Sequence, residues 1–249
     1  MKEKIYIASC SFGKDSIATI LLALEHNEPL DRAVFAEVMF DHSRGISGEI
    51  PEHIDWIYST AIPKLEGMGV KVDIVRDKKD YVTQFYGVIS KGKYEGKIHG
   101  FPMANHCTIQ RDMKLRPIHA YYKQFADKDI IQYVGIAADE KLRLLRLRGN
   151  KVSLMDRYGC TEADAMSLCK SYGLLSPIYE TGTRGGCWFC PNMRPDCAKS
   201  IRQNYPELWE ELSRLAEAPN KACETFRFNK TFAEVNAKLD AMDAQQKLF

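Results

Sequence analysis

Apolar runs and helix-like spacings alternate along the first 140 residues. Four segments are continuously apolar or alternate between apolar and polar residues, which is typical of strands. They are the segments 4–10, 33–40, 70–75 and 130–137. Between them, residues 17–24 and 51–69 place apolar residues at helical spacing, with Pro51 suited to a first turn and Gly69 to a helix end. This order predicts an α/β fold with a doubly wound, mostly parallel sheet and helices on both faces.

The pattern changes after about residue 150. Thr161 and Asp164 form a weak capping box, which predicts a helix that ends at Tyr172. Shorter helical segments are expected around 196–216 and 230–247, whereas the polar stretch 76–106 has no clear pattern. We therefore predict two domains: an α/β domain over 1–180 and a small, mainly helical extension over 181–249 that carries cysteines.

The turn between the first strand and the first helix has the chemistry of a phosphate site. Gly13 lets the backbone approach an anion closely, and the helix start offers N–H groups and a partial positive charge. Ser11 and Ser16 add hydroxyl donors, and Lys14 adds a charge. The alternative is a simple helix start with Asp15 or Ser16 in the first turn. A Walker A loop is excluded, because its second glycine and Gly-Lys-Ser/Thr end are absent.

Composition narrows the class of protein only a little. The 249 residues are 45% hydrophobic and 27% charged, as in an ordinary globular protein. A net charge of +2 does not by itself indicate a nucleic-acid or membrane partner. The sequence has no apolar run of membrane-spanning length and no signal-peptide core before the first strand. We expect a cytoplasmic protein without a membrane partner.

The eight cysteines point to metal binding, catalysis or burial, because disulfides are rare in a reducing compartment. Cys187 and Cys190 form a Cys-x-x-Cys pair in a glycine-rich loop, where two thiolates can reach one metal. Trp188 and Phe189 between them are expected to shield that metal from water. Cys107 and Cys197 together would complete a four-thiolate site, and either one alone would complete a three-thiolate site with one open position. The alternative for both residues is that they are simply buried side chains. The other four are expected to be small buried side chains: Cys10, Cys160, Cys169 and Cys223.

Two groups of motifs carry a family resemblance that extends over about residues 4–215. Ser-x-Gly-x-Asp-Ser at 11–16 resembles the PP-loop of the adenine nucleotide alpha-hydrolase superfamily. The segments 107–118 (Cys-Thr-x-x-x-x-x-Lys-x-Arg-Pro-Ile) and 185–192 (Gly-Gly-Cys-Trp-Phe-Cys-Pro-Asn) are similar to the phosphoadenosine phosphosulfate (PAPS) reductase-like family and to its DNA-phosphorothioation relatives. The resemblance implies a HUP/Rossmann-like PP-loop domain. It also implies a [4Fe-4S] cluster on the cysteines, with zinc as the alternative.

Further site residues follow from the strand ends and from the resemblance. Asp41 and Glu140 lie just after expected strands, where ligands bind in such sheets, and Glu140 would hold Mg²⁺ or orient Arg143. Arg143 would pair with a phosphate, unless it only forms a helix-surface pair with Glu140. Lys114 would address phosphate or sulfate, with a solvated face as the alternative. Arg184 is a candidate for a substrate anion.

The favoured function is ATP-dependent adenylation followed by sulfur transfer, with Asp15 and Lys114 as catalytic residues and the PP-loop gripping the pyrophosphate with Mg²⁺. One alternative is reduction of adenylyl sulfate or phosphoadenylyl sulfate, although the family's Glu-Cys-Gly-x-His segment is absent. Another is a zinc-braced nucleotide sensor without catalysis. Expected partners are an adenine nucleotide and a sulfur or electron donor. A nucleic-acid acceptor is suggested by the basic run 141–148, which a charged helix face explains equally well, and a homodimer stays open.

Overall fold

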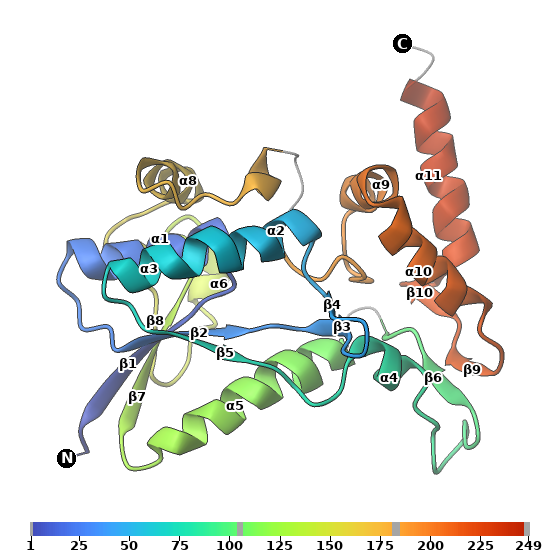
Figure 1. Ribbon diagram of the computed structural model, residues 1–249, viewed down its shortest axis with the longest axis horizontal. Helices are drawn as coiled ribbons and strands as arrows, with labels where there is room; N and C mark the ends of the chain where they lie inside the picture. The colour runs from blue at the N-terminus through green and yellow to red at the C-terminus, as the bar shows by residue number, and fades with distance from the viewer. Residues whose placement is uncertain (1, 104–106, 181–184, 247–249) are drawn as a thin grey trace. The chain divides into compact units, whose positions relative to one another are not determined.

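A computed structural model describes residues 2–103, 107–180 and 185–246 (Figure 1). The chain packs as two compact units, and each is assembled from separate segments. The first unit contains Met1–Glu37, Glu49–Arg76 and Leu115–Gly185, and the second contains Val38–Gly48, Asp77–Lys114 and Gly186–Phe249. The sequence analysis predicted a single division of the chain near residue 180. In the structure, the chain passes from one unit to the other between Gly185 and Gly186, and also at four earlier points.

The first unit is built on a five-stranded sheet with the order β5-β2-β1-β7-β8. All four strand pairings are parallel. The strands are β1 (Lys4–Ser9), β2 (Arg32–Ala36), β5 (Val72–Val75), β7 (Asp129–Val134) and β8 (Lys151–Val152). Central β1 pairs with β7 over its whole length, from Lys4 opposite Asp129 to Ser9 opposite Val134. The predicted α/β class with a parallel sheet is confirmed.

Helices cover both faces of this sheet (Figure 1). They are α1 (Lys14–Glu25), α2 (Pro51–Trp56), α3 (Ile62–Gly67), α5 (Arg116–Tyr122), α6 (Lys141–Leu144), α7 (Leu154–Arg157) and α8 (Glu162–Ser171). The larger core joins buried residues of α1, such as Ile17 and Leu21, to Phe35 of β2 and Cys169 of α8. On the opposite face, Tyr121 of α5 packs with Ile5, Ile7 and Val34. Helices therefore bury both sides of the strands, as parallel sheets require.

The second unit contains three two-stranded sheets among its described residues. Strands β3 (Met39–Asp41) and β4 (Ile46–Ser47) pair antiparallel, as do β10 (Thr225–Arg227) and β11 (Lys230–Thr231). Strands β6 (Ile98–Gly100) and β9 (Lys221–Cys223) pair in parallel. The helices are α4 (Tyr81–Phe85), α9 (Pro195–Asn204), α10 (Pro206–Glu217) and α11 (Phe232–Gln246).

Several predicted elements differ in detail. The segment 33–40 holds two strands, because the chain leaves the first unit after Glu37. The predicted helix over 51–69 is interrupted by a π-helical turn at Ile57–Ala61. Pro63 lacks the N–H that would pair with the Ser59 carbonyl, which accounts for the irregular turn. The capping box of α8 is confirmed. The Thr161 side chain accepts a hydrogen bond from the Asp164 backbone N–H, and the Asp164 side chain accepts one from the Thr161 backbone N–H.

Among the described residues, no helix has both the length and the apolar character needed to cross a bilayer.

Candidate functional site

Two loops meet where the connections of the first unit's sheet change direction. Strand β1 lies between β2 on one side and β7 on the other, and the loops after β1 and β7 leave from the same edge. In open parallel sheets, ligands bind beyond the carboxyl ends of the strands at this kind of point. The loop 10–16 and the segment 135–140 both lie there, so this edge is the candidate ligand site.

The loop after β1 is shaped by its own side chains. The Ser16 hydroxyl donates to the Gly13 carbonyl at 2.9 Å and accepts from the Ser11 N–H at 3.2 Å. Phe12 takes a left-handed backbone with φ of 56°, and its buried ring packs 5.1 Å from the Phe35 ring. Gly13 itself has an ordinary φ of −73°. Ser16 therefore closes the loop, and the unusual backbone belongs to Phe12 rather than to the glycine.

Two residues that the sequence analysis did not single out fix the start of α1. The Lys14 N–H donates to Tyr179 Oη at 2.8 Å. A Cβ atom on Gly135, just after β7, would lie 2.7 Å from the Asp15 carbonyl carbon and 2.7 Å from the Ser16 nitrogen. Only glycine lets the end of β7 approach the helix start so closely. The two loops are therefore packed directly against each other.

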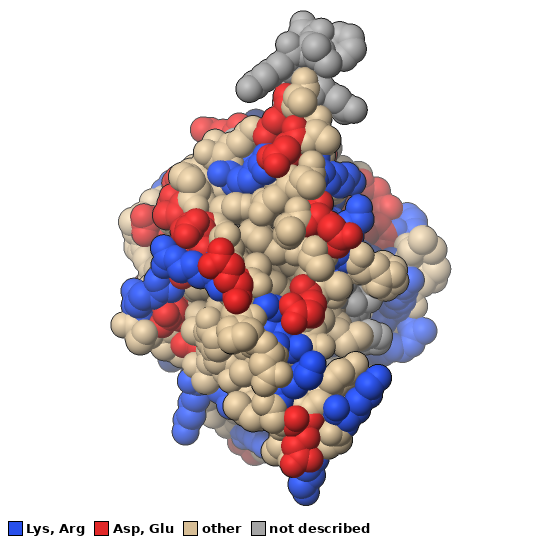
Figure 2. All heavy atoms as spheres, turned by 90° about the vertical axis from the view of Figure 1, so that its right-hand side faces the viewer, with Lys and Arg blue, Asp and Glu red and all other residues tan. Residues whose placement is uncertain are grey.

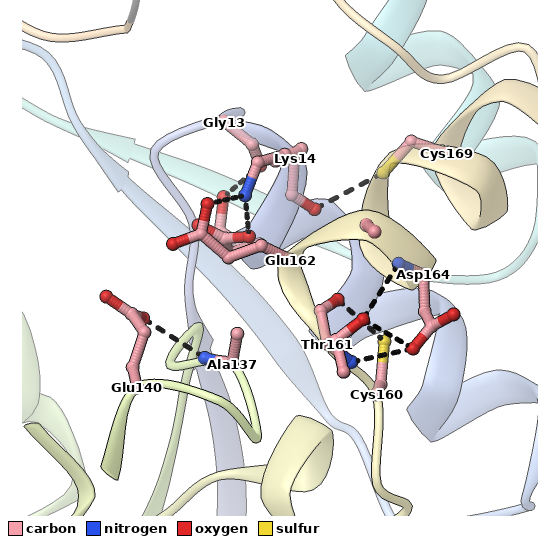
Figure 3. A network of polar contacts seen from close by, with 12 residues as sticks. Gly13, Lys14, Ala137, Glu140, Cys160, Thr161, Glu162, Asp164 and Cys169 are labelled. Atoms are coloured by element: carbon pink, nitrogen blue, oxygen red, sulfur yellow. Dashed lines mark hydrogen bonds and ion pairs between the residues drawn. The ribbon is translucent and has the colours of Figure 1, made fainter.

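Carboxylates surround the only lysine of the loop (Figure 3). Lys14 Nζ lies 2.6 Å from Asp15 Oδ1 and 3.1 Å from Glu162 Oε2, at the start of α8. Glu140 accepts from the Ala137 N–H at 3.1 Å and pairs with Arg143 Nη1 at 2.5 Å. Carboxylate oxygens are the ligands that Mg²⁺ prefers. Asp15, Glu140 and Glu162 therefore add negative charge to the candidate ligand site.

The acidic surroundings change the pKa values of the loop. Burial is the largest cause of the raised pKa of Asp15; the Lys14 ammonium opposes it, and Glu162 and Glu140 add to it. Burial lowers the pKa of Lys14, but the hydrogen bonds to Asp15 and Glu162 outweigh it, so the net pKa is raised. Both groups therefore keep their protons to higher pH than they would in water.

Replacing Asp15 with asparagine is expected to stabilise the free protein at pH 7 and to weaken nucleotide binding about tenfold or more. A raised folded-state pKa means that ionising Asp15 costs stability as pH rises, so the stabilisation should vanish below about pH 4, where the carboxyl is protonated in both states. Urea unfolding from pH 3 to 7.5 and calorimetric titration with Mg-ATP measure the two effects. The exposed Asp55→Asn variant on α2 is the control. A variant that is less stable at pH 7, or binds nucleotide as tightly as the original protein, would contradict this role.

The three cysteines of the first unit are buried, as predicted. Burial is the largest cause of their raised pKa, which reaches about 11 for Cys10 and Cys160 and about 12 for Cys169. Cys169 Sγ donates to the Lys14 carbonyl at 3.2 Å (Figure 3). These residues stay thiols at neutral pH and act as small core side chains.

In the second unit, the loop between Cys187 and Cys190 is held by the tryptophan within it. The Trp188 N–H donates to the Gly48 carbonyl at 2.9 Å, and its Nε1 donates to the Ser47 carbonyl at 2.9 Å. The Cys190 N–H donates to the Cys187 carbonyl at 3.0 Å, which closes the turn. Trp188 and Phe189 are buried, and their role in shielding a metal stays a prediction.

Tyr81, the first residue of α4, lies among four cysteines of this unit. Burial is the largest cause of its strongly raised pKa, and electrostatic interactions with four cysteines add to it. They are Cys107, Cys187, Cys190 and Cys223. Cys197 lies in α9 and is buried. Three of the predicted ligands, Cys107, Cys187 and Cys190, thus influence Tyr81 together with Cys223, which was expected to be buried and is half-buried.

In the described part of the chain, no three His, Cys, Asp or Glu side chains are placed to hold one metal ion. That finding concerns a single ion, around which four tetrahedral thiolates at about 2.3 Å would lie about 4 Å apart. In a four-iron cluster each iron takes its own thiolate. These half-buried cysteines and the buried Tyr81 hydroxyl are donors whose chemistry fits such a cluster.

The remaining predicted residues have other surroundings. Asp41 accepts from the Ser43 hydroxyl at 2.6 Å and from Arg44 Nε at 2.8 Å, and its pKa falls to about 2 because these bonds outweigh burial. Arg44 also forms a bidentate pair with Glu211 at 2.8 Å. Lys114 is half-buried in a π-helical turn, Gln110–Leu115. Arg184 lies outside the described residues. A nucleotide role for Asp41 and a catalytic role for Lys114 stay predictions.

The basic run 141–148 is helical only over α6, and Leu142 and Leu145 are exposed. Arg143 pairs with Glu140, as the helix-surface alternative requires, and Arg148 caps the Leu145 and Leu147 carbonyls at 2.7 and 2.8 Å. On the face drawn in Figure 2, acidic and basic side chains of the described residues are intermixed. A nucleic-acid acceptor stays a prediction.

The sequence was compared with known proteins. No family model matches it. An uncharacterized protein of Methanocaldococcus jannaschii, MJ0066, is 20% identical over 223 residues, which cover 86% of this chain and 42% of that protein. The chain therefore spans less than half the length of this relative. No solved structure matches.

Proposed function

We propose that this protein is a PP-loop enzyme of the HUP type that binds ATP, or a related adenylyl nucleotide, and uses it for sulfur transfer. The observation that carries the proposal is the position of the loop 11–16, between the end of β1 and the start of α1, where the sheet changes direction. The helix start supplies N–H donors and a partial positive charge for phosphate. Gly135 brings the second loop against it.

The residues at this edge of the sheet would have separate roles in binding the nucleotide and its Mg²⁺. The N–H groups of the loop and the Ser11 hydroxyl would bind the pyrophosphate part of the nucleotide. At least one of Asp15, Glu140 and Glu162 would contact the hydrated Mg²⁺ that bridges to it, and Lys14 would move from its carboxylate partners to a phosphate oxygen. A substrate oxygen would then attack the α-phosphorus and release pyrophosphate, which gives an adenylated substrate and later AMP. Rate enhancement would come from positioning and charge stabilisation.

The cysteines of the second unit would hold an iron–sulfur cluster. Their thiolate chemistry fits such a group, and when bound it supplies electron transfer or sulfide delivery. Trp188 and Phe189 would exclude water from it. A brown, iron-bearing protein after anaerobic purification is the expected result, while a colourless protein with one zinc per chain would favour a braced sensor.

Product analysis under anaerobic conditions tests the proposed activity. The protein is incubated with Mg²⁺ and a reductant plus ATP, adenylyl sulfate or phosphoadenylyl sulfate, in the presence of sulfide and a panel of acceptors. AMP and pyrophosphate from ATP are the expected products. Sulfite from either sulfate nucleotide would replace the proposal with the reductase alternative, and no product or binding from any of the three would overturn it.

A pair of variants links that activity to the loop. Asp15→Ala is expected to lower AMP formation at least tenfold, because the loop loses a carboxylate for Mg²⁺. The exposed Asp55→Ala variant should retain full activity. Equal activity of both variants would place the reaction elsewhere.

A further inference from the structure

Tyr81 has a buried hydroxyl that lacks a hydrogen-bond partner among the described residues. Tyr81 is 1% exposed, so bulk water does not supply the missing hydrogen bond. Buried polar groups in native proteins are nearly always paired, and an exception calls for an explanation such as an unseen ligand. The hydroxyl therefore points to a group that is not part of the described polypeptide.

Helix α4 gathers two of the cysteine segments around that hydroxyl. The ring of Phe189, inside the Cys187–Cys190 turn, lies 4.2 Å from the Tyr81 ring. Gln84 Nε2, three residues along α4, donates to Thr108 Oγ1 at 2.5 Å, which fixes the residue after Cys107. These contacts tie Cys107 and the Cys-x-x-Cys turn to the same short helix.

Strand β9 brings Cys223 to the same place. Cys223 is paired with Gly100 of β6, and its carbonyl accepts from the Phe101 N–H at 3.3 Å (Figure 1). Gly100 has a φ of +75°, and a Cβ there would lie 2.4 Å from the Cys223 oxygen, so glycine is needed for this pairing. The Phe101 ring packs edge-on to Phe85 of α4 at 5.2 Å. Two β-paired segments thus link Cys223 to α4 through Phe101, and the Cys223 thiol itself lies 3.6 Å from the Thr225 carbonyl and hydroxyl oxygens.

We infer that Cys223, rather than Cys197, is the fourth cysteine ligand with Cys107, Cys187 and Cys190, and that Tyr81 Oη donates a hydrogen bond to a sulfur atom of the bound group. The inference rests on the proposed function only for the identity of that group as an iron–sulfur cluster. A hydroxyl donor is suited to the negative charge on thiolate or sulfide.

Four protein thiolates leave no iron of the cluster open. The sulfur to be transferred would then come from a separate donor molecule rather than from a vacant iron. A three-thiolate site would instead leave one iron open to carry that sulfur. The ligand set therefore decides how the proposed enzyme receives the sulfur that it transfers.

Metal content tests the ligand assignment. Wild-type, Cys223→Ser and Cys197→Ser proteins are purified anaerobically, and iron, sulfide, zinc and visible absorption are measured per chain. Cys223→Ser is expected to lose most of the metal or to retain three irons, while Cys197→Ser retains the full amount. Far-ultraviolet circular dichroism of both variants checks that they fold. Full metal in Cys223→Ser with loss in Cys197→Ser would overturn the inference.

Tyr81→Phe tests the hydrogen bond without removing a ligand. Iron and sulfide content should be unchanged, and the reduction potential should move to a more negative value, because hydrogen bonds to cluster sulfurs stabilise the reduced form. An unchanged potential in a fully loaded variant would overturn the role of Tyr81.

These outcomes are separate from those of the proposed activity. If the wild type holds zinc and no iron, the cluster chemistry fails, but zinc loss in Cys223→Ser and not in Cys197→Ser still decides the ligand set. If none of the nucleotides gives a product, the proposed activity fails, but the iron content of the two cysteine variants still tests the ligand assignment.

Discussion

Gly135→Ala is expected to weaken Mg-nucleotide binding about 10- to 100-fold, because each hydrogen bond lost to a charged phosphate costs about 1.5–3 kcal/mol. The new methyl group would lie 2.7 Å from backbone atoms of Asp15 and Ser16, which cannot rotate away as a side chain could. The start of α1 would have to move from the end of β7, and with it the N–H groups proposed to bind phosphate. Unfolding free energy should also fall by about 1–3 kcal/mol, the usual cost of overpacking.

Isothermal titration with Mg-ATP and urea unfolding measure these effects. The control is Gly67→Ala in α3, where a Cβ would meet nothing within 4 Å. That variant should bind nucleotide normally and change stability by at most about 1 kcal/mol, in the stabilising direction. A Gly135→Ala protein that binds within threefold of the wild type would show that the contact between the two loops does not shape the site.

Trp188→Ala is expected to destabilise the second unit by about 3–5 kcal/mol and to abolish metal retention. The indole is fully buried, lies 4.5 Å from Phe40 and 5.1 Å from Phe189, and donates to the Ser47 carbonyl at 2.9 Å. Removing it leaves a large cavity between the two predicted thiolate ligands that flank it. Total stabilities of about 5–15 kcal/mol make such a loss severe.

Trp188→Phe separates packing from hydrogen bonding. A six-membered aromatic ring is kept, while the Nε1 donor and part of the indole volume are lost, so the expected loss is about 1–2 kcal/mol, with metal retained. Chemical unfolding followed by near-ultraviolet circular dichroism, together with iron and zinc analysis, gives both quantities. A Trp188→Ala variant that loses less than about 1 kcal/mol, or keeps its metal, would contradict the structural role.

The nucleotide side of the fold is largely readable from local patterns. Apolar strands, the turn at 11–16 and the capping box at Thr161 are each encoded within a few neighbouring residues, and the structure places them as expected. What local patterns did not reveal are the partners contributed from far along the chain. Lys14 contacts Tyr179, which lies 165 positions further along the chain, and Glu162, which lies 148 positions further. In the sequence, Glu162 is recognisable only as an acidic residue in the first turn of a predicted helix. Gly135 lies inside the fourth predicted strand, 130–137, and a glycine within a strand was the available signal for this close approach.

The cysteine side depends on pairings that have no local signature. The Cys-x-x-Cys spacing identifies Cys187 and Cys190, and the motif resemblance identifies Cys107. Cys223 sits in a three-residue strand, and its neighbour β6 lies in the polar stretch 76–106 that shows no clear pattern. Short strands paired over more than 100 residues cannot be recognised from a periodicity of two. Cys197 looked preferable because of its nearness in sequence alone.

A crystal structure of the anaerobically purified protein with Mg²⁺ and a non-hydrolysable ATP analogue tests the central claim most directly. The expected result is a nucleotide whose phosphates accept hydrogen bonds from the N–H groups of residues 11–16, with Mg²⁺ on at least one of Asp15, Glu140 and Glu162. A nucleotide bound elsewhere, or none at saturating concentration, would contradict the claim that this turn is the nucleotide site.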